Sequence, residues 1–170
     1  LAAGASNALS DGAGVSADRA SAALNSAADL TITGTGSLDV TGAANDGIAS
    51  SDGLIIQSGT ITVHAVDDGI RGKDYLIVRG GSIDVVAGGD GLKSDNEEDA
   101  TRGYIALLGG DTTITSDDEG LDAFTDVVVT EVAGTAESSD TTLKITAGGG
   151  NAVGGEDASA KGISAGVIGV

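Results

Sequence analysis

One acidic position recurs through the sequence inside a repeated tripeptide. The copies are Asp46-Gly47-Ile48, Asp68-Gly69-Ile70, Asp90-Gly91-Leu92 and Glu119-Gly120-Leu121. Their acidic residues are separated by 22, 22 and 29 residues. If a repeating fold stacks these positions about 4.8 Å apart, neighbouring carboxylates repel by roughly 3 to 4 kcal/mol at an effective dielectric constant near 20. A hard cation that binds several carboxylates at once relieves this repulsion.

Further oxygen-bearing side chains lie beside this column or in an acidic stretch that follows its third member. The predicted metal ligands are Asn45, Asp46, Asp67, Asp68, Asp90, Asp95, Asp99, Asp118, Glu119 and Asp122. We expect Ca²⁺ as the cofactor, because it accepts carboxylate, amide and turn carbonyl oxygens in variable number, whereas Mg²⁺ demands a stricter octahedron. A solvated acidic surface is the alternative interpretation of the same residues.

Basic residues are few, and four of them cluster near the column. Arg71 and Lys93 each stand three residues after a column aspartate, and Lys73 and Arg79 are close by. One interpretation is charge compensation, which contributes little where the pairs are exposed. The other is a binding surface, formed by Arg71, Lys73 and Lys93, for a carboxylated ligand that calcium bridges to the protein.

Composition excludes several classes of function. The 170 residues include 26 acidic and 8 basic side chains, for a net charge of -18, and such a charge repels nucleic acid and anionic membranes. Cysteine is absent, and no apolar run approaches 18 residues, so neither a disulfide framework nor membrane insertion is expected. With His64 as the single histidine, a Ser-His-Asp triad has little support. We therefore predict no catalytic residue.

The elements that position the column are short strands. Apolar residues alternate in pairs such as Leu38/Val40 and Ile61/Val63, the period of a strand with one buried face. Repeats of about 22 residues, made of strands and glycine corners, are typical of the coils of a parallel β-helix. Three inward ladders would form its core. They are Leu30/Leu54/Leu76/Ile105/Val127, Leu38/Ile61/Ile83 and Ile48/Ile70/Leu92/Leu121.

The repeat predicts a single domain over residues 1–170, with its most regular coils at 29–130. We predict three loop insertions, at residues 95–102, 131–140 and 148–160. Both ends are apolar and lack an obvious cap, which repeat proteins need. We therefore expect either a longer natural chain or end-to-end self-association.

Order and spacing of several segments resemble a known family. The segments are Asn45-Asp46-Gly47-Ile48-Ala49-Ser50, Ser58-Gly59-Thr60-Ile61-Thr62-Val63, Asp67-Asp68-Gly69-Ile70-Arg71-Gly72-Lys73-Asp74 and Gly89-Asp90-Gly91-Leu92-Lys93-Ser94-Asp95-Asn96-Glu97-Glu98-Asp99. They resemble the carbohydrate-binding-domain family of secreted, pectate-lyase-like β-helix proteins, most strongly over 29–122. The resemblance implies a right-handed, single-stranded parallel β-helix, bound calcium, and binding of acidic polysaccharide such as polygalacturonate without cleavage. Glu119 departs from the aspartate of the pattern.

Three functions follow as hypotheses. The first is a non-catalytic, calcium-dependent module that binds uronate-rich polysaccharide in a secreted or cell-surface protein. The second is a pectate lyase, in which calcium acidifies the proton next to the uronate carboxylate and Arg71 or Lys93 removes it. The third is a structural, filament-forming surface protein, which the uncapped ends would allow.

Overall fold

A computed structural model describes residues 1–12, 22–130, 140–148 and 160–170, and in this part the chain forms three parallel six-stranded sheets. The first sheet contains β1 (Ser6–Ser10), β4 (Ser37–Gly42), β7 (Thr60–Ala65), β10 (Ser82–Ala87), β13 (Gly110–Ser116) and β16 (Thr141–Thr146). The second contains β2 (Ala22–Ser26), β5 (Asp46–Ser50), β8 (Ile70–Gly72), β11 (Leu92–Ser94), β14 (Leu121–Ala123) and β17 (Ile163–Ser164). The third contains β3 (Leu30–Ile32), β6 (Gly53–Ile56), β9 (Tyr75–Val78), β12 (Tyr104–Leu107), β15 (Asp126–Val129) and β18 (Val167–Gly169).

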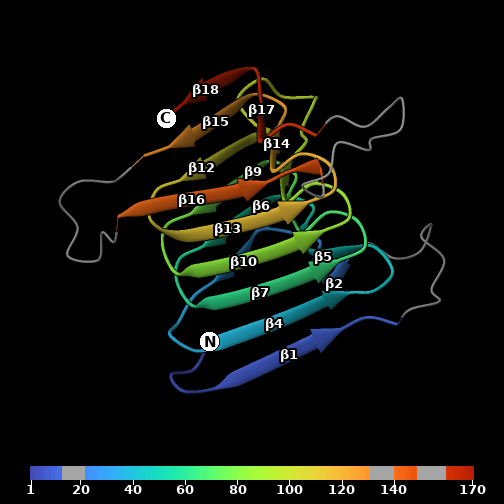
Figure 1. The fold of residues 1–170 in the computed structure, drawn as a ribbon, viewed down its shortest axis with the longest axis vertical. Helices are drawn as coiled ribbons and strands as arrows, with labels where there is room; N and C mark the ends of the chain where they lie inside the picture. Colours follow the sequence, from blue (N-terminus) through green and yellow to red (C-terminus); the bar gives the residue numbers. More distant parts are fainter. Residues whose placement is uncertain (13–21, 131–139, 149–159) are drawn as a thin grey trace.

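The chain visits the three sheets in turn, so strands of one sheet are stacked along the long axis of the molecule (Figure 1). This arrangement is consistent with a parallel β-helix of triangular cross-section. Within the described residues, no helix is long and apolar enough to cross a membrane.

Coil length is where the sequence prediction fails. Asp90 follows its stacked neighbour Asp68 by 22 residues, but Glu119 follows Asp90 by 29 residues. A further 42 residues separate Glu119 from Lys161, its partner in the next coil. The prediction of a right-handed, single-stranded parallel β-helix with about 22 residues per coil is therefore wrong in this form. Strand pairing fixes the register of the ladders, whereas the loops between strands are free to vary in length.

The three predicted ladders form the core. Leu54, Leu76, Ile105 and Val127 are stacked in register in the third sheet, with Leu30 at one end, and all but Leu30 are fully buried. The other two ladders, Leu38/Ile61/Ile83 and Ile48/Ile70/Leu92/Leu121, are likewise paired and buried. The alternation predicted from sequence is confirmed in β10, whose side chains are exposed and buried in turn. Each ladder buries aliphatic side chains against the strand above and below, the main favourable term for folding.

Glycine in the repeated tripeptide is required by close packing at the corner between the first and second sheets. A Cβ on Gly47 would lie 2.3 Å from Val63 Cγ1, and one on Gly69 would lie 2.3 Å from Val85 Cγ1. No side chain fits at these two positions, so Asp46 and Asp68, which precede these glycines, are held at the corner of their coils.

Among the predicted insertions, residues 95–102 connect β11 to β12 and contain no strand. The other two, 131–140 and 148–160, lie outside the described residues except at Asp140, Gly148 and Ala160.

Candidate metal centre

The acidic column runs along the corner between the first and second sheets. The side chains of Asp46, Asp68, Asp90 and Glu119 follow one another there, and each residue is between 4% and 8% exposed. Asp68 Oδ1 accepts a hydrogen bond from the backbone N–H of Asp90 at 2.9 Å, and Asp90 Oδ1 accepts one from the N–H of Glu119 at 3.0 Å. The predicted stacking is confirmed, and each of these two aspartates satisfies a backbone donor of the next coil.

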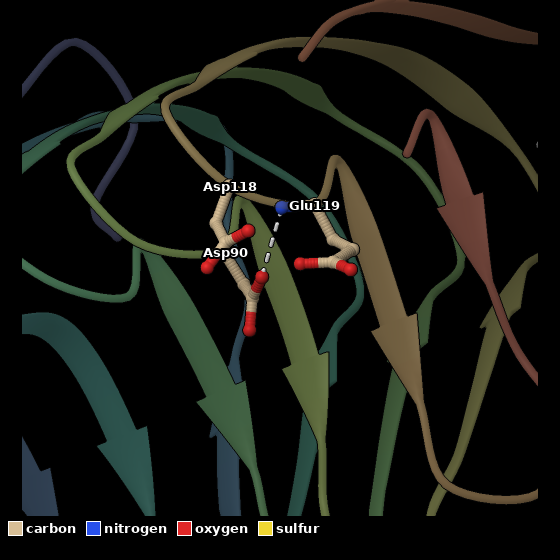
Figure 2. A group of neighbouring side chains, drawn as sticks. All are labelled: Asp90, Asp118 and Glu119. Carbon is tan, nitrogen blue, oxygen red and sulfur yellow. Dashed lines mark hydrogen bonds between the residues drawn. The ribbon is translucent and has the colours of Figure 1, made fainter. Parts of the chain in front are cut away.

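Three carboxylates converge at the C-terminal part of this column. Asp90, Asp118 and Glu119 each offer one oxygen, and these oxygens lie within 4.8 Å of one another (Figure 2). Asp90 and Glu119 are buried and Asp118 is half-buried. An all-oxygen set of this size and charge suits a hard cation such as Ca²⁺. All three residues belong to the predicted ligand set.

Two lysines already neutralise part of this charge. Lys93 Nζ lies 2.7 Å from Asp90 Oδ2 and 3.1 Å from Asp68 Oδ2. Lys161 Nζ lies 3.1 Å from Glu119 Oε1. Charge compensation is thus one real role of Lys93, and a cation at the three carboxylates would have to share Asp90 with it.

Burial makes ionisation costly along the column. Desolvation, and then the charges of Asp68 and Asp67, raise the pKa of Asp46 to about 7. Desolvation also raises the pKa of Asp90 to about 6, against the opposing effect of Lys93. A divalent cation bound at Asp90 would favour the ionised form of this carboxyl group and lower its pKa.

Other predicted ligands lie away from the three carboxylates. Asp95 accepts two hydrogen bonds from Arg71, at 2.7 and 3.0 Å, and so pairs with a predicted ligand-binding cation. Asp99 accepts hydrogen bonds from the backbone N–H and hydroxyl of Thr101 and pairs with Arg102, in the loop after β11.

The remaining predicted residues belong to the earlier coils or to the loop after β8. Asp67 is exposed beside the column, whereas Asn45 is half-buried just before Asp46. Lys73 is half-buried, and its backbone carbonyl accepts hydrogen bonds from the N–H of Asn96 and the hydroxyl of Ser94. These contacts tie the acidic loop to the previous coil.

A groove of about 380 Å³ opens beside the carboxylate group, over β11, β14 and β17. Lys93 lines it and also contacts Asp90, so the groove and the acidic column share a side chain. Asp122, a predicted ligand, lies in its wall, and burial is the main cause of its raised pKa. The exposed ring of Phe124 also lines it. The groove is therefore acidic, with one cation and one aromatic ring.

Sequence reasoning missed Lys161 and Phe124. Lys161 stands directly before Gly162-Ile163, which is a degraded copy of the tripeptide, and that register was the signal for its place next to Glu119. Phe124 carries no such signal, because it follows β14 as a lone exposed aromatic.

Comparison with known proteins gives both a family and a fold relative. A family model described as "Carbohydrate-binding domain-containing protein" matches residues 1–169. The solved "Structure of the polysaccharide lyase-like protein from C. thermocellum, Gadolinium derivative" is similar, with 29% identity and a TM-score of 0.70. That match covers 100% of this chain and 66% of the other, so the chain spans just under two thirds of that protein's length. Among curated proteins, none matches this chain.

Proposed function

The chain belongs to the carbohydrate-binding domain-containing family, and from that premise we propose that it is a non-catalytic module that binds uronate-rich polysaccharide through Ca²⁺. Asp90, Asp118 and Glu119 would hold the ion. The observation that carries this proposal is the approach of their oxygens to within 4.8 Å of one another beside a groove.

Electrostatics explains why a metal is needed. A protein with a net charge of -18 repels a polyuronate chain. The groove beside the column is lined by Asp95, Glu97 and Asp122, with Lys93 as its cation, so its own charge opposes a carboxylated sugar. A bound Ca²⁺ supplies positive charge and vacant coordination positions for carboxylate oxygens. Affinity for polyuronate should therefore depend on calcium rather than on protein cations alone.

The donor chemistry supports this assignment. Asp90, Asp118 and Glu119 offer carboxylate oxygens, the ligands that Ca²⁺ prefers. The polysaccharide lyase-like relative was studied as a gadolinium derivative, and Gd³⁺ is a hard cation with the same preference for oxygen ligands as Ca²⁺.

A lyase needs a general base that is unprotonated at working pH, which for Lys or Arg means the neutral form. Arg71 and Lys93 are poor candidates, because ion pairs with Asp95 and with Asp90 and Asp68 outweigh desolvation and raise the pKa of each cation. We therefore favour binding without cleavage. Because the proposed ligand is an extracellular polysaccharide, a secreted or cell-surface location is part of the proposal. End-to-end self-association stays a prediction.

Affinity electrophoresis in a polygalacturonate gel tests the proposal. We expect calcium to retard the protein and a chelator to abolish the retardation. Asp118→Asn should lose most of the retardation, whereas Asp117→Asn, an equal charge change at an exposed neighbour, should keep it. Equal retardation in chelator and in calcium would contradict the proposal. If the protein instead released unsaturated product that absorbs in the ultraviolet, the chain would be a lyase and the proposal of a non-catalytic module would be wrong.

A further inference from the structure

A second groove, of about 430 Å³, lies where strands of the third sheet begin, at their N-terminal ends. It is separate from the proposed calcium site. Its lining residues are Asp29, Asp52, Asp74, Tyr75, Thr101, Arg102 and Tyr104. The groove therefore contains both tyrosines of the chain, three carboxylates and one guanidinium group.

The two tyrosines form a stacked pair. Tyr75 begins β9, Tyr104 begins β12, and the two residues are directly paired in the sheet. Their ring centroids lie 5.7 Å apart with 23° between the ring planes. Both residues are only half-buried, so part of this aromatic surface faces the groove.

Tyr75 lies along the sheet surface. The residue one strand before it is Gly53, where a Cβ would lie 2.0 Å from Tyr75 Cζ, so the ring occupies the place of a missing side chain. Asp29, whose Oδ1 accepts a hydrogen bond from the N–H of Gly53 at 2.9 Å, lines the same groove as the Tyr75 ring. The Tyr75 ring thus extends from its own strand over Gly53, where no side chain competes for the space.

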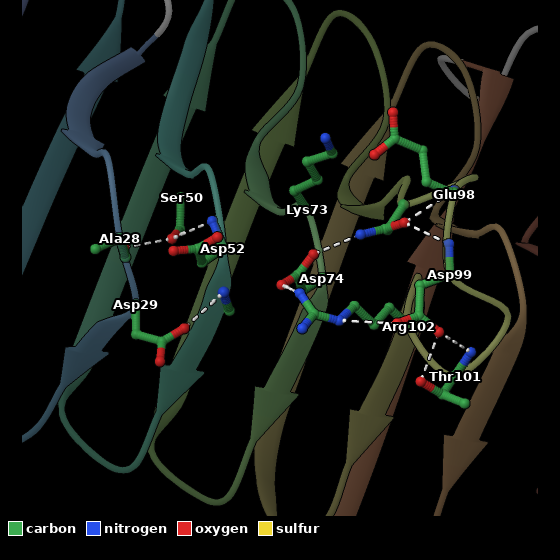
Figure 3. A network of polar contacts seen from close by, with 12 residues as sticks. Ala28, Asp29, Ser50, Asp52, Lys73, Asp74, Glu98, Asp99, Thr101 and Arg102 are labelled. Carbon is green, nitrogen blue, oxygen red and sulfur yellow. Dashed lines mark hydrogen bonds and ion pairs between the residues drawn. The ribbon is translucent and has the colours of Figure 1, made fainter.

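Acidic side chains line the edge of this aromatic strip. Asp29, Asp52 and Asp74 follow one another along the stack, and Arg102 lies beyond Asp74 (Figure 3). Asp74 is 6% exposed, accepts a hydrogen bond from Asn96 Nδ2 at 2.6 Å, and pairs with Arg102. Asp74 is therefore held in place by partners within the protein.

Aromatic surface beside fixed hydrogen-bonding groups is the composition of a small-molecule site. Aromatic rings pack against the apolar C–H faces of sugar rings, and carboxylates accept strong hydrogen bonds from hydroxyl groups. Three carboxylates repel a uronate, and the single cation, Arg102, is already paired with Asp74 and Asp99. We infer that the groove formed by Tyr75, Tyr104 and Asp29/Asp52/Asp74 binds a neutral, hydroxyl-rich polysaccharide, independently of calcium.

The composition of the chain supplies a direct probe. Trp is absent and the two tyrosines are Tyr75 and Tyr104, so tyrosine fluorescence reports on this groove alone. The protein, in chelator, is titrated separately with oligosaccharides of β-1,4-glucan, galactomannan and xylan, and with oligogalacturonate. We expect a saturable fluorescence change with at least one neutral chain and none with oligogalacturonate.

Calorimetry with the responding neutral chain identifies the residues. Tyr104→Ala should weaken binding about fivefold or more, and Tyr104→Phe, which keeps the ring, should bind within twofold of the wild type. Phe124→Ala, which removes an exposed aromatic from the other groove, and Asp118→Asn should leave neutral-chain binding unchanged. The inference is overturned if no neutral chain binds, or if a folded Tyr104→Ala variant binds as well as wild type. Calcium-dependent retardation by polygalacturonate is a separate result that neither outcome alters.

Discussion

Replacing Lys93 with methionine removes the cation that faces two column carboxylates. Its Nζ lies 2.7 Å from Asp90 and 3.1 Å from Asp68, and its side chain is 25% exposed. Loss of one partner of a fully buried ion pair costs about 3 to 5 kcal/mol, and partial exposure reduces this to about 2 to 3 kcal/mol. For a domain of this size, that corresponds to a fall in Tm of about 4 to 12 °C.

The same variant should bind calcium more tightly, because the ion no longer shares Asp90 with an ammonium group. Denaturant unfolding in chelator measures the destabilisation, and calcium titration measures the gain in affinity. Lys144→Met is the matched control, since Lys144 is an exposed lysine on β16. The reasoning is refuted if Lys93→Met and Lys144→Met lose equal stability in chelator, or if Lys93→Met binds calcium less tightly than the wild type.

Two further predictions concern packing and pH. Gly69→Ala places a Cβ 2.3 Å from Val85 Cγ1 and 2.6 Å from the Gly91 carbonyl oxygen, so unfolding should become easier by about 1 to 3 kcal/mol. Gly162→Ala, in the last copy of the tripeptide, meets nothing within 4 Å and should change stability by less than about 0.5 kcal/mol; equal losses would show that the corner is not tightly packed. Asp46, with a pKa of about 7 in the folded protein against an ordinary value of 3.8, binds its proton more tightly when folded, as does Asp90 with a pKa of about 6. In chelator, their contribution to stability is therefore lost as pH rises from about 4 to 7, so Tm should rise when pH is lowered from 8 to 5, and less so in Asp46→Asn. A Tm that instead falls steadily as pH is lowered from 8 to 5 in chelator would contradict this explanation of the column.

The acidic column and the core ladders were predictable because strand pairing fixes their register. Residues 46, 68 and 90 recur at one interval, and the ladder of Ile48, Ile70 and Leu92 recurs with them. Each column aspartate stands two residues before a member of this paired ladder, so it must be stacked on the aspartate of the next coil. The local spacing thus carried three-dimensional information.

Coil length and the choice of ion-pair partners were not predictable by the same reasoning. Lys161 reaches Glu119 across 42 residues of sequence, because the length of the chain between β14 and β17 does not change the register in which these two strands pair. Asp95 and Asp99 look like metal ligands by composition, but Arg71 and Thr101 lie within hydrogen-bonding distance of them. Composition gives the number of carboxylates, whereas the fold decides which of them converge.

The tyrosine groove escaped the sequence analysis for a related reason. Tyr75 and Tyr104 each stand directly before a core residue of the same ladder, Leu76 and Ile105, so their pairing could be read from the register. The position of the Tyr75 ring in the groove that Asp29 also lines could not be read from the register, because it depends on the missing side chain at Gly53. Only the folded backbone shows that the ring lies along the sheet.

A crystal structure of the calcium-soaked protein, with the ion located by its anomalous scattering, tests the central claim most directly. The account predicts a peak about 2.3 to 2.6 Å from carboxylate oxygens of Asp90, Asp118 and Glu119. A protein that binds polygalacturonate in calcium, but whose crystals hold the ion elsewhere or show no ion at these three residues, would contradict it.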